Sequence, residues 1–215
     1  LKLTNADIEK FVNAFKSTKK DTKREFKFIK GEDIAKYYNI KNYFLKTGTL
    51  GFSCMDDEKD KVFKLYTENE KKVQLLVLVD EKDMVHGRAL VWKLEESPCE
   101  AKYFMDRVYV NSDSDFYKFK QLAEEKGFLY KKEMTCYIQD NVRFVYKNKE
   151  ILGEVIVKLE EGDFKKYPFV DTMCFLDKKK KRLSNIPSKD CYMLHSVNGE
   201  CAECEDCEGE VTRYN

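Results

Sequence analysis

The sequence lacks the features that mark membrane-spanning, secreted and strongly charged proteins. Lys and Arg number 40 against 39 Asp and Glu, so a net charge of +1 gives no overall field to attract nucleic acid or an anionic membrane. There is no run of about 18 apolar residues and no charged-then-apolar leader, so we expect neither a membrane span nor a signal peptide. With only three prolines in 215 residues, long disordered linkers are not expected either.

The eight cysteines are unevenly placed. Cys54, Cys99, Cys136 and Cys174 are isolated in apolar or mixed segments, as buried thiols of intracellular proteins are, and the other four fall between residues 191 and 207. A disulfide framework would spread them more evenly. The distribution therefore predicts a reducing compartment and a metal site near the C-terminus.

The C-terminal run CAECEDC separates Cys201, Cys204 and Cys207 by two residues each, a spacing that lets thiolates converge on one tetrahedral zinc ion. A fourth ligand is needed, and Cys191 or His195 lies within reach on the preceding predicted strand. We predict a structural zinc site. An iron–sulfur cluster, which also uses closely spaced cysteines, and a tail of free thiols are the alternatives.

Apolar periodicity predicts an α+β fold. Ile8, Phe11, Val12 and Phe15 fall at i, i+3, i+4 and i+7, which is typical of an amphipathic helix. Short elements are expected next: a strand over residues 26–28, a helix over 32–38, a glycine-containing loop over 48–51 and a helix over 62–66.

The central part of the chain gives the clearest pattern. Segments 72–80, 85–94 and 101–110 are rich in β-branched and aromatic residues and predict three strands. A helix capped at Ser112 or Asp113 and ended by Gly127 follows, and then another strand. We predict one domain with a mixed, mainly antiparallel sheet and helices packed on one side of it, followed by a small metal-binding tail. The expected boundaries are residues 1–190 and 191–215.

This β-β-β-α-β order, over about residues 60–135, resembles the central section of the GNAT acetyltransferase fold. The resemblance implies a glycine-containing loop before the helix, Gln/Arg-x-x-Gly-x-Gly/Ala, whose backbone amides hold the pyrophosphate of acetyl-CoA. The chain has NSDSD in that place, and Asp113 and Asp115 would repel a pyrophosphate. At the C-terminus, CEDCEGEV resembles half of the C-x-x-C-x-G-x-G unit of the DnaJ cysteine-rich domain.

Five stretches resemble uncharacterised proteins of large tailed bacteriophages: KGEDIAKYY, GTLGFSCM, GRALVWK, FMDRVYV and YPFVDT. The resemblance is scattered over most of the chain. It implies a viral protein that works in the host cytoplasm or is packaged in the virion, and it implies no activity.

Four residues in these stretches are candidate catalytic groups. Strand alternation puts Asp106 and Arg107 on opposite faces, and a buried Asp106 would need a partner such as Arg88. A structural ion pair is the simpler explanation of this set. Cys54 follows two glycines and could act as a nucleophile, with His86 as its base.

The basic run KKKKR, residues 178–182, could grip phosphates, although such a run is more often a solvated hairpin turn. The leading hypothesis is a phage-encoded intracellular accessory protein that binds a macromolecular partner, with zinc holding its C-terminal segment in shape. We expect the partner to be a protein. The alternatives are a GNAT-like acyltransferase and a nucleic-acid-binding protein.

Overall fold

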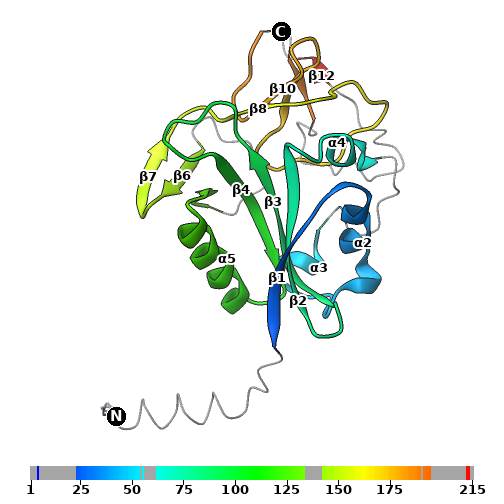
Figure 1. The fold of residues 1–215 in the computed structure, drawn as a ribbon, viewed down its shortest axis with the longest axis vertical. Helices are drawn as coiled ribbons and strands as arrows, with labels where there is room; N and C mark the ends of the chain where they lie inside the picture. Colours follow the sequence, from blue (N-terminus) through cyan, green and yellow to red (C-terminus); the bar gives the residue numbers. More distant parts are fainter. Residues whose placement is uncertain are drawn as a thin grey trace.

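The computed structural model describes residues 23–53, 62–133, 142–189 and 191–194, together with the single residues 4 and 55 and the pair 212–213. These residues form an α+β fold with a seven-stranded sheet and, at one end of it, a five-stranded sheet (Figure 1). No described helix is long and apolar enough to cross a membrane. The predicted N-terminal helix and the cysteine run lie outside the described residues.

The seven-stranded sheet is mixed and mostly antiparallel, as predicted. Its spatial order equals its sequence order: β1 (Arg24–Ile29), β2 (Val73–Asp80), β3 (Val85–Lys93), β4 (Tyr103–Val110), β5 (Leu129–Lys131), β6 (Arg143–Tyr146) and β7 (Lys149–Leu152). Only the β4–β5 pair is parallel, and helix α5 (Asp113–Lys126) makes the crossover between these two strands. The β-β-β-α-β order is therefore confirmed.

Short helices precede β2. They are η1 (Gly31–Asp33), α2 (Ile34–Tyr38), η2 (Ile40–Asn42), α3 (Gly48–Gly51) and α4 (Lys64–Thr67). The predicted loop over 48–51 is thus a helical turn. Both of its glycines are required, because Gly48 has a φ of +64° and a Cβ on Gly51 would lie 2.3 Å from the carbonyl carbon of Lys46.

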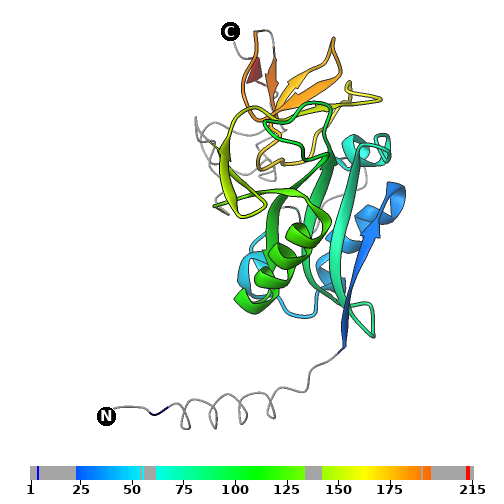
Figure 2. The same ribbon diagram turned by 60° about the vertical axis from the view of Figure 1, so that its left-hand side comes forward.

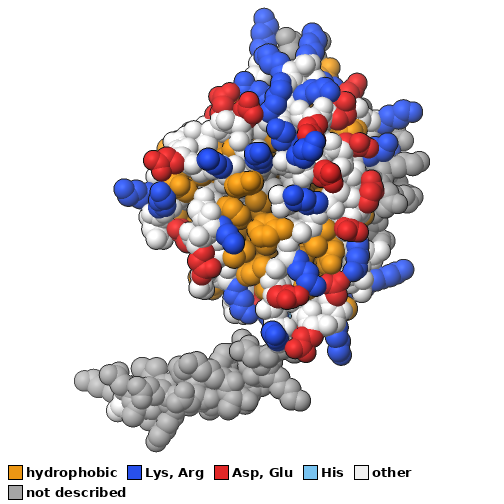
Figure 3. Space-filling model, in the orientation of Figure 1, with side chains coloured by type: hydrophobic (Ala, Val, Ile, Leu, Met, Phe, Trp, Pro, Cys, Tyr) orange, Lys and Arg blue, Asp and Glu red, His pale blue; other side chains and the backbone are white. Residues whose placement is uncertain are grey.

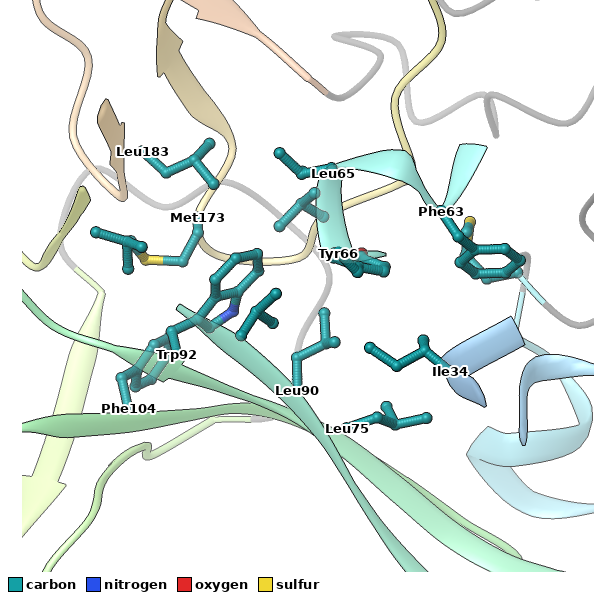
Figure 4. Close-up of a cluster of buried hydrophobic side chains, with 14 of the residues drawn as sticks. Ile34, Phe63, Leu65, Tyr66, Leu75, Leu90, Trp92, Phe104, Met173 and Leu183 are labelled. Carbon is teal, nitrogen blue, oxygen red and sulfur yellow. The ribbon is translucent and has the colours of Figure 1, made fainter. Parts of the chain in front are cut away.

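Helices lie on both faces of the sheet, whereas one side was expected. The helices before β2 pack on one face and α5 packs on the other (Figures 1 and 2). The first face holds the larger core, which joins the sheet to the short helices and to the C-terminal segment (Figure 4). Its labelled side chains are Ile34, Phe63, Leu65, Tyr66, Leu75, Leu90, Trp92, Phe104, Met173 and Leu183.

The second sheet has the order β12-β11-β9-β10-β8. Its strands are β8 (Ile156–Lys158), β9 (Phe175–Asp177), β10 (Arg182–Ser184), β11 (Tyr192–Met193) and β12 (Thr212–Arg213). The basic run forms the predicted turn between β9 and β10. β11, which follows the expected boundary at residue 190, pairs with β9 and also with β12.

Candidate functional site

The five stretches with the phage resemblance meet around one small cavity on the helix α2 side of the sheet. Each stretch contributes to its lining, through Tyr38, Ser53, Arg88, Asp106 and Asp171 respectively, and the other described lining residues fall in the same stretches. The cavity has room for about one water molecule. It brings three of the four candidate catalytic residues together.

A β-bulge in β4 aims two adjacent side chains at this cavity. Ala89 pairs with Val108 but Val91 pairs with Met105, so Leu90 faces both Asp106 and Arg107. Both of these residues line the cavity. The expectation that alternation puts them on opposite faces is therefore wrong, because the extra residue of a bulge breaks the two-residue period.

Asp106 is buried, and its carboxylate is bonded on several sides. The hydroxyl of Thr172 donates to Oδ1 at 2.5 Å, the backbone N–H of Arg107 donates to the same atom at 2.8 Å, and Trp92 Nε1 donates to Oδ2 at 3.4 Å. Burial and then the negative charge of Asp171 raise the pKa of Asp106 to about 6. A carboxyl group of this kind can exchange a proton near neutral pH.

Arg88 is buried on β3 and is held by the segment before β2. Its Nη2 donates to Ser53 Oγ at 2.6 Å, its Nη1 donates to the hydroxyl of Tyr43, and its guanidinium carbon lies 4.0 Å from the ring centre of Tyr38. Burial raises the pKa of Tyr38 to about 12, so this phenol stays protonated. The guanidinium is therefore fixed by aromatic and hydroxyl groups.

Arg107 and Tyr109 bind the segment that leads to β9. Arg107 Nη1 lies 3.1 Å from Asp171 Oδ1, and the Tyr109 hydroxyl donates to the two oxygens of the same carboxylate at 3.0 and 2.9 Å. Together with the Thr172–Asp106 bond, these contacts fasten residues 171–172 to β4. Asp171 and Thr172 are site residues that no local pattern predicts, although their stretch YPFVDT carries part of the phage resemblance.

The proposed Cys54–His86 pair is not tested, because Cys54 lies outside the described residues. Its neighbours Ser53 and Met55 line the cavity. His86 is not among the lining residues. Its Nε2 lies 3.2 Å from Asp80 Oδ2, and its ring stacks on Phe44 with the centres 4.2 Å apart.

The N-terminus of α5, where the GNAT resemblance puts a pyrophosphate, holds a carboxylate of the chain itself. Asp115 is buried, and its Oδ1 accepts a hydrogen bond from Arg24 Nη1 at 2.6 Å. The end of β4 beside it is covered too, since Thr49 Oγ1 accepts from the backbone N–H of Val110 at 2.9 Å. A phosphate there would meet a negative charge, as the sequence predicted.

The other face of the sheet carries an open groove of about 580 Å³ between β1 and α5. Phe26, Leu78 and Leu122 form its apolar part, and the space-filling view shows apolar side chains gathered at this place (Figure 3). Lys23 and Lys118 are among the polar residues at its sides. Beyond the groove, the apolar surface continues through Phe28, 41% exposed, which contacts Phe128 with ring centres 6.3 Å apart.

The predicted zinc ligands are only partly described. Cys191 is a buried free thiol in a cluster with Cys174, Phe175 and Met193. Cys201, Cys204, Cys207 and His195 lie outside the described residues. Among the residues that are described, no group of three or more metal-ligating side chains occurs.

Comparisons of the chain with models of known protein families, with curated proteins and with solved structures found no match.

Proposed function

We propose that the chain is an accessory protein that binds a protein partner through the groove between β1 and α5. The observation that carries this proposal is an open groove that exposes parts of Phe26 and Leu122 and has the 41% exposed Phe28 beside it. Apolar side chains grouped on a protein surface and bordered by polar ones are a feature of interaction sites. The phage resemblance extends the proposal to a protein that acts in the host cytoplasm or inside a virion.

The cavity on the opposite face is a weaker candidate for the main function. It holds about one water molecule, and the hydrogen bonds of Asp106 and Arg88 go to groups of the chain itself. These bonds join β3 and β4 to residues 43–53 and 171–172. A structural role accounts for this network, because its hydrogen bonds hold the surrounding segments against the sheet.

A GNAT-like acyltransferase is the second candidate function. It is supported by the parallel β4–β5 pair with its α5 crossover, and by the bulge that puts Asp106, with its pKa near 6, beside the point where the two strands part. The buried Asp115 carboxylate at the N-terminus of α5 argues against a pyrophosphate held in that family's manner. We therefore propose a GNAT-like scaffold that serves binding.

Nucleic-acid binding has the least support. Four of the five cations in the basic run lie within 2.8–3.4 Å of carboxylates: Lys178 with Asp163, Lys180 with Asp177, Lys181 with Glu161 and Arg182 with Glu154. A phosphate backbone would have to displace these pairs before it gained from the positive charge.

We also propose that zinc holds the C-terminal segment, with Cys201, Cys204 and Cys207 as ligands and Cys191 or His195 as the fourth. The strands on either side of the cysteine run, β11 and β12, pair with each other. In the sequence, Cys201, Cys204 and Cys207 fall between these two strands at the two-residue spacing that suits one tetrahedral metal site.

The test compares a groove variant with a matched surface variant of the same helix. Leu122→Asp puts a charge into the groove, whereas Tyr117→Asp changes a side chain that is 67% exposed on α5. Immobilised wild type and Tyr117→Asp should retain the same protein from a lysate of host cells, and Leu122→Asp should lose it while keeping its circular dichroism spectrum. Equal retention by all three contradicts the proposal.

The acyltransferase candidate is tested in parallel by the melting temperature with and without acetyl-CoA. Binding to the folded state raises the melting temperature by mass action. We expect no shift at millimolar acetyl-CoA. If acetyl-CoA raises the melting temperature, and Asp115→Asn makes that increase larger, the cofactor binds at the N-terminus of α5. This result would favour the acyltransferase.

A further inference from the structure

We propose that the occupant of the groove is an amphipathic helix, and that the chain supplies one itself, residues 5–16, which competes with the partner. This inference rests on the function proposed above and adds its regulation. The segment is the one predicted from the spacing of Ile8, Phe11, Val12 and Phe15.

Chain continuity is the first argument. Lys23 and Arg24, which line the groove, follow directly on the N-terminal segment. The link between the predicted helix and Lys23 is residues 17–22, which span at most about 20 Å. A tether of this length keeps the segment at an effective concentration on the order of millimolar near the groove.

The dimensions agree. A helix over residues 5–16 would be about 18 Å long, and the 14-residue α5 that forms one wall is about 21 Å long. The six residues of β1 on the other side span about 20 Å. The link at residues 17–22 would let the helix run antiparallel to β1 and therefore along the whole groove.

The chemistry of the two surfaces is complementary. On the predicted helix the four apolar side chains of the segment would form one stripe, and the groove offers the partly exposed Phe26 and Leu122 to it, with the buried Leu78 beneath them. Asp7 and Glu9 flank the stripe on the predicted helix, while the sides of the groove carry Lys23, Arg24 and Lys118 against one acidic residue, Glu125; Arg24 and Lys118 also contact Asp115. Helix-in-groove recognition uses this combination of spaced apolar anchors and a charged border.

A segment that fills the groove weakens the binding of any partner. The apparent affinity is the intrinsic affinity multiplied by the fraction of molecules whose groove is free. The partner is therefore expected to present an amphipathic helix with anchors at the same spacing. It must also bind more tightly than a tethered competitor.

The experiment uses the full chain and a synthetic, fluorescein-labelled peptide of residues 4–18. The variant Phe11→Asp/Phe15→Asp breaks the stripe, and Lys10→Asp changes the opposite face of the predicted helix as its matched control. Hydrogen exchange in β1 and α5 and the anisotropy of the peptide are measured for each. Analytical size exclusion with light scattering gives the oligomeric state.

We expect the wild type and Lys10→Asp to protect β1 and the groove side of α5 and to bind the peptide weakly. In the stripe variant, the amide protons of β1 and α5 should exchange several-fold faster, and the peptide should bind at least tenfold more tightly. Adding Leu122→Asp should abolish that binding. Equal protection in all variants, or no peptide binding by the stripe variant, overturns the inference. The inference is also overturned if the wild type and Lys10→Asp are dimers and the stripe variant is a monomer, because the segment then docks on a second copy.

The two proposals fail differently. If the peptide binds as expected but no captured protein depends on Leu122, the segment is a permanent part of the fold and the proposed function is wrong. If a captured protein depends on Leu122 but the stripe variant behaves like the wild type, the function stands and this inference is wrong.

Discussion

Arg24 on β1 donates a 2.6 Å hydrogen bond to Asp115 in the first turn of α5, across 91 positions of sequence. The pair joins the edge strand of the large sheet to the helix that packs on that face, and Arg24 also lines the groove. Lys118 lies farther from the same carboxylate, at 3.4 Å. The carboxylate is almost fully buried, at 1% exposure, whereas the Arg24 side chain is 23% exposed.

We predict that Arg24→Met lowers the free energy of unfolding by about 2–3 kcal/mol, because the buried carboxylate then keeps the Ser112 hydroxyl at 3.1 Å and the more distant Lys118 but loses its 2.6 Å ion pair. Arg24→Met/Asp115→Leu should recover most of that loss, since an apolar pair needs no counter-charge. Urea unfolding measures both. The control is Arg143→Met, at an exposed position of β6, which should cost less than about 0.5 kcal/mol. A loss in Arg24→Met no larger than in this control would contradict the prediction.

The pH dependence of stability should reveal the buried Asp106. Its pKa is raised from 3.8 to about 6 in the folded state, so between these values the folded chain holds a proton that the unfolded chain has released. Its contribution is therefore fully present below about pH 4 and is lost as the pH rises through 6. The stability gap between wild type and Asp106→Asn should shift against the wild type by up to about 3 kcal/mol from pH 4 to pH 7.5.

Glu161→Gln gives a contrast of opposite sign. The backbone N–H groups of Asp163 and Gly162, and then Lys181, lower the pKa of Glu161 to about 2. Its contribution is present above pH 4.5 and is lost as the pH falls towards 2. Unfolding curves collected from pH 2 to pH 8 should therefore show slopes of opposite sign for the two variants relative to wild type. Slopes of the same sign would show that Asp106 is ionised throughout.

Gly87 is predicted to tolerate no side chain. A Cβ there would lie 2.7 Å from Val110 Cγ1 and 2.8 Å from Phe119 Cε2, between β3 and α5. Gly87→Ala should cost about 1–3 kcal/mol through overpacking. Gly162→Ala is its control, because the nearest atom to that Cβ is 3.5 Å away, and it should be neutral within about 0.5 kcal/mol. Thermal unfolding of the two variants settles the comparison.

The metal content of the chain, purified without chelator, tests the C-terminal prediction. We expect about one zinc per chain in the wild type and in Cys99→Ser, whose thiol is isolated from the cysteine run. Cys204→Ser should lose the zinc. Iron in place of zinc would favour a cluster, and absence of both metals would leave the thiols free.

The sequence predicted the elements whose pattern is local. The β-branched runs of β2, β3 and β4, and the capped helix ended by Gly127 at a φ of +66°, each carry a signal within a dozen residues. The turn in the basic run belongs to the same group. These elements alone determine the β-β-β-α-β order.

The site could not be predicted in this way, because its geometry depends on contacts between distant segments. Asp106 and Arg107 share a cavity because β4 has a bulge opposite Leu90. No residue type in FMDRVYV predicts a bulge at that position. Thr172 reaches Asp106 across 66 positions of sequence. Nothing local distinguishes it from other threonines, so the sequence points to Arg88 as a partner of the buried carboxylate but not to Thr172.

β4 and β5 are joined by two residue pairs only, Phe104 with Leu129 and Met105 with Tyr130. We therefore expect the seven strands to behave as two units, β1–β4 and β5–β7, which are joined by a seam of two residue pairs. Under a pulling force, or in the partial openings that precede global unfolding, the seam is the place where the sheet divides first. Amide protons of β5–β7 should then exchange as one cooperative unit, ahead of those in β2 and β3.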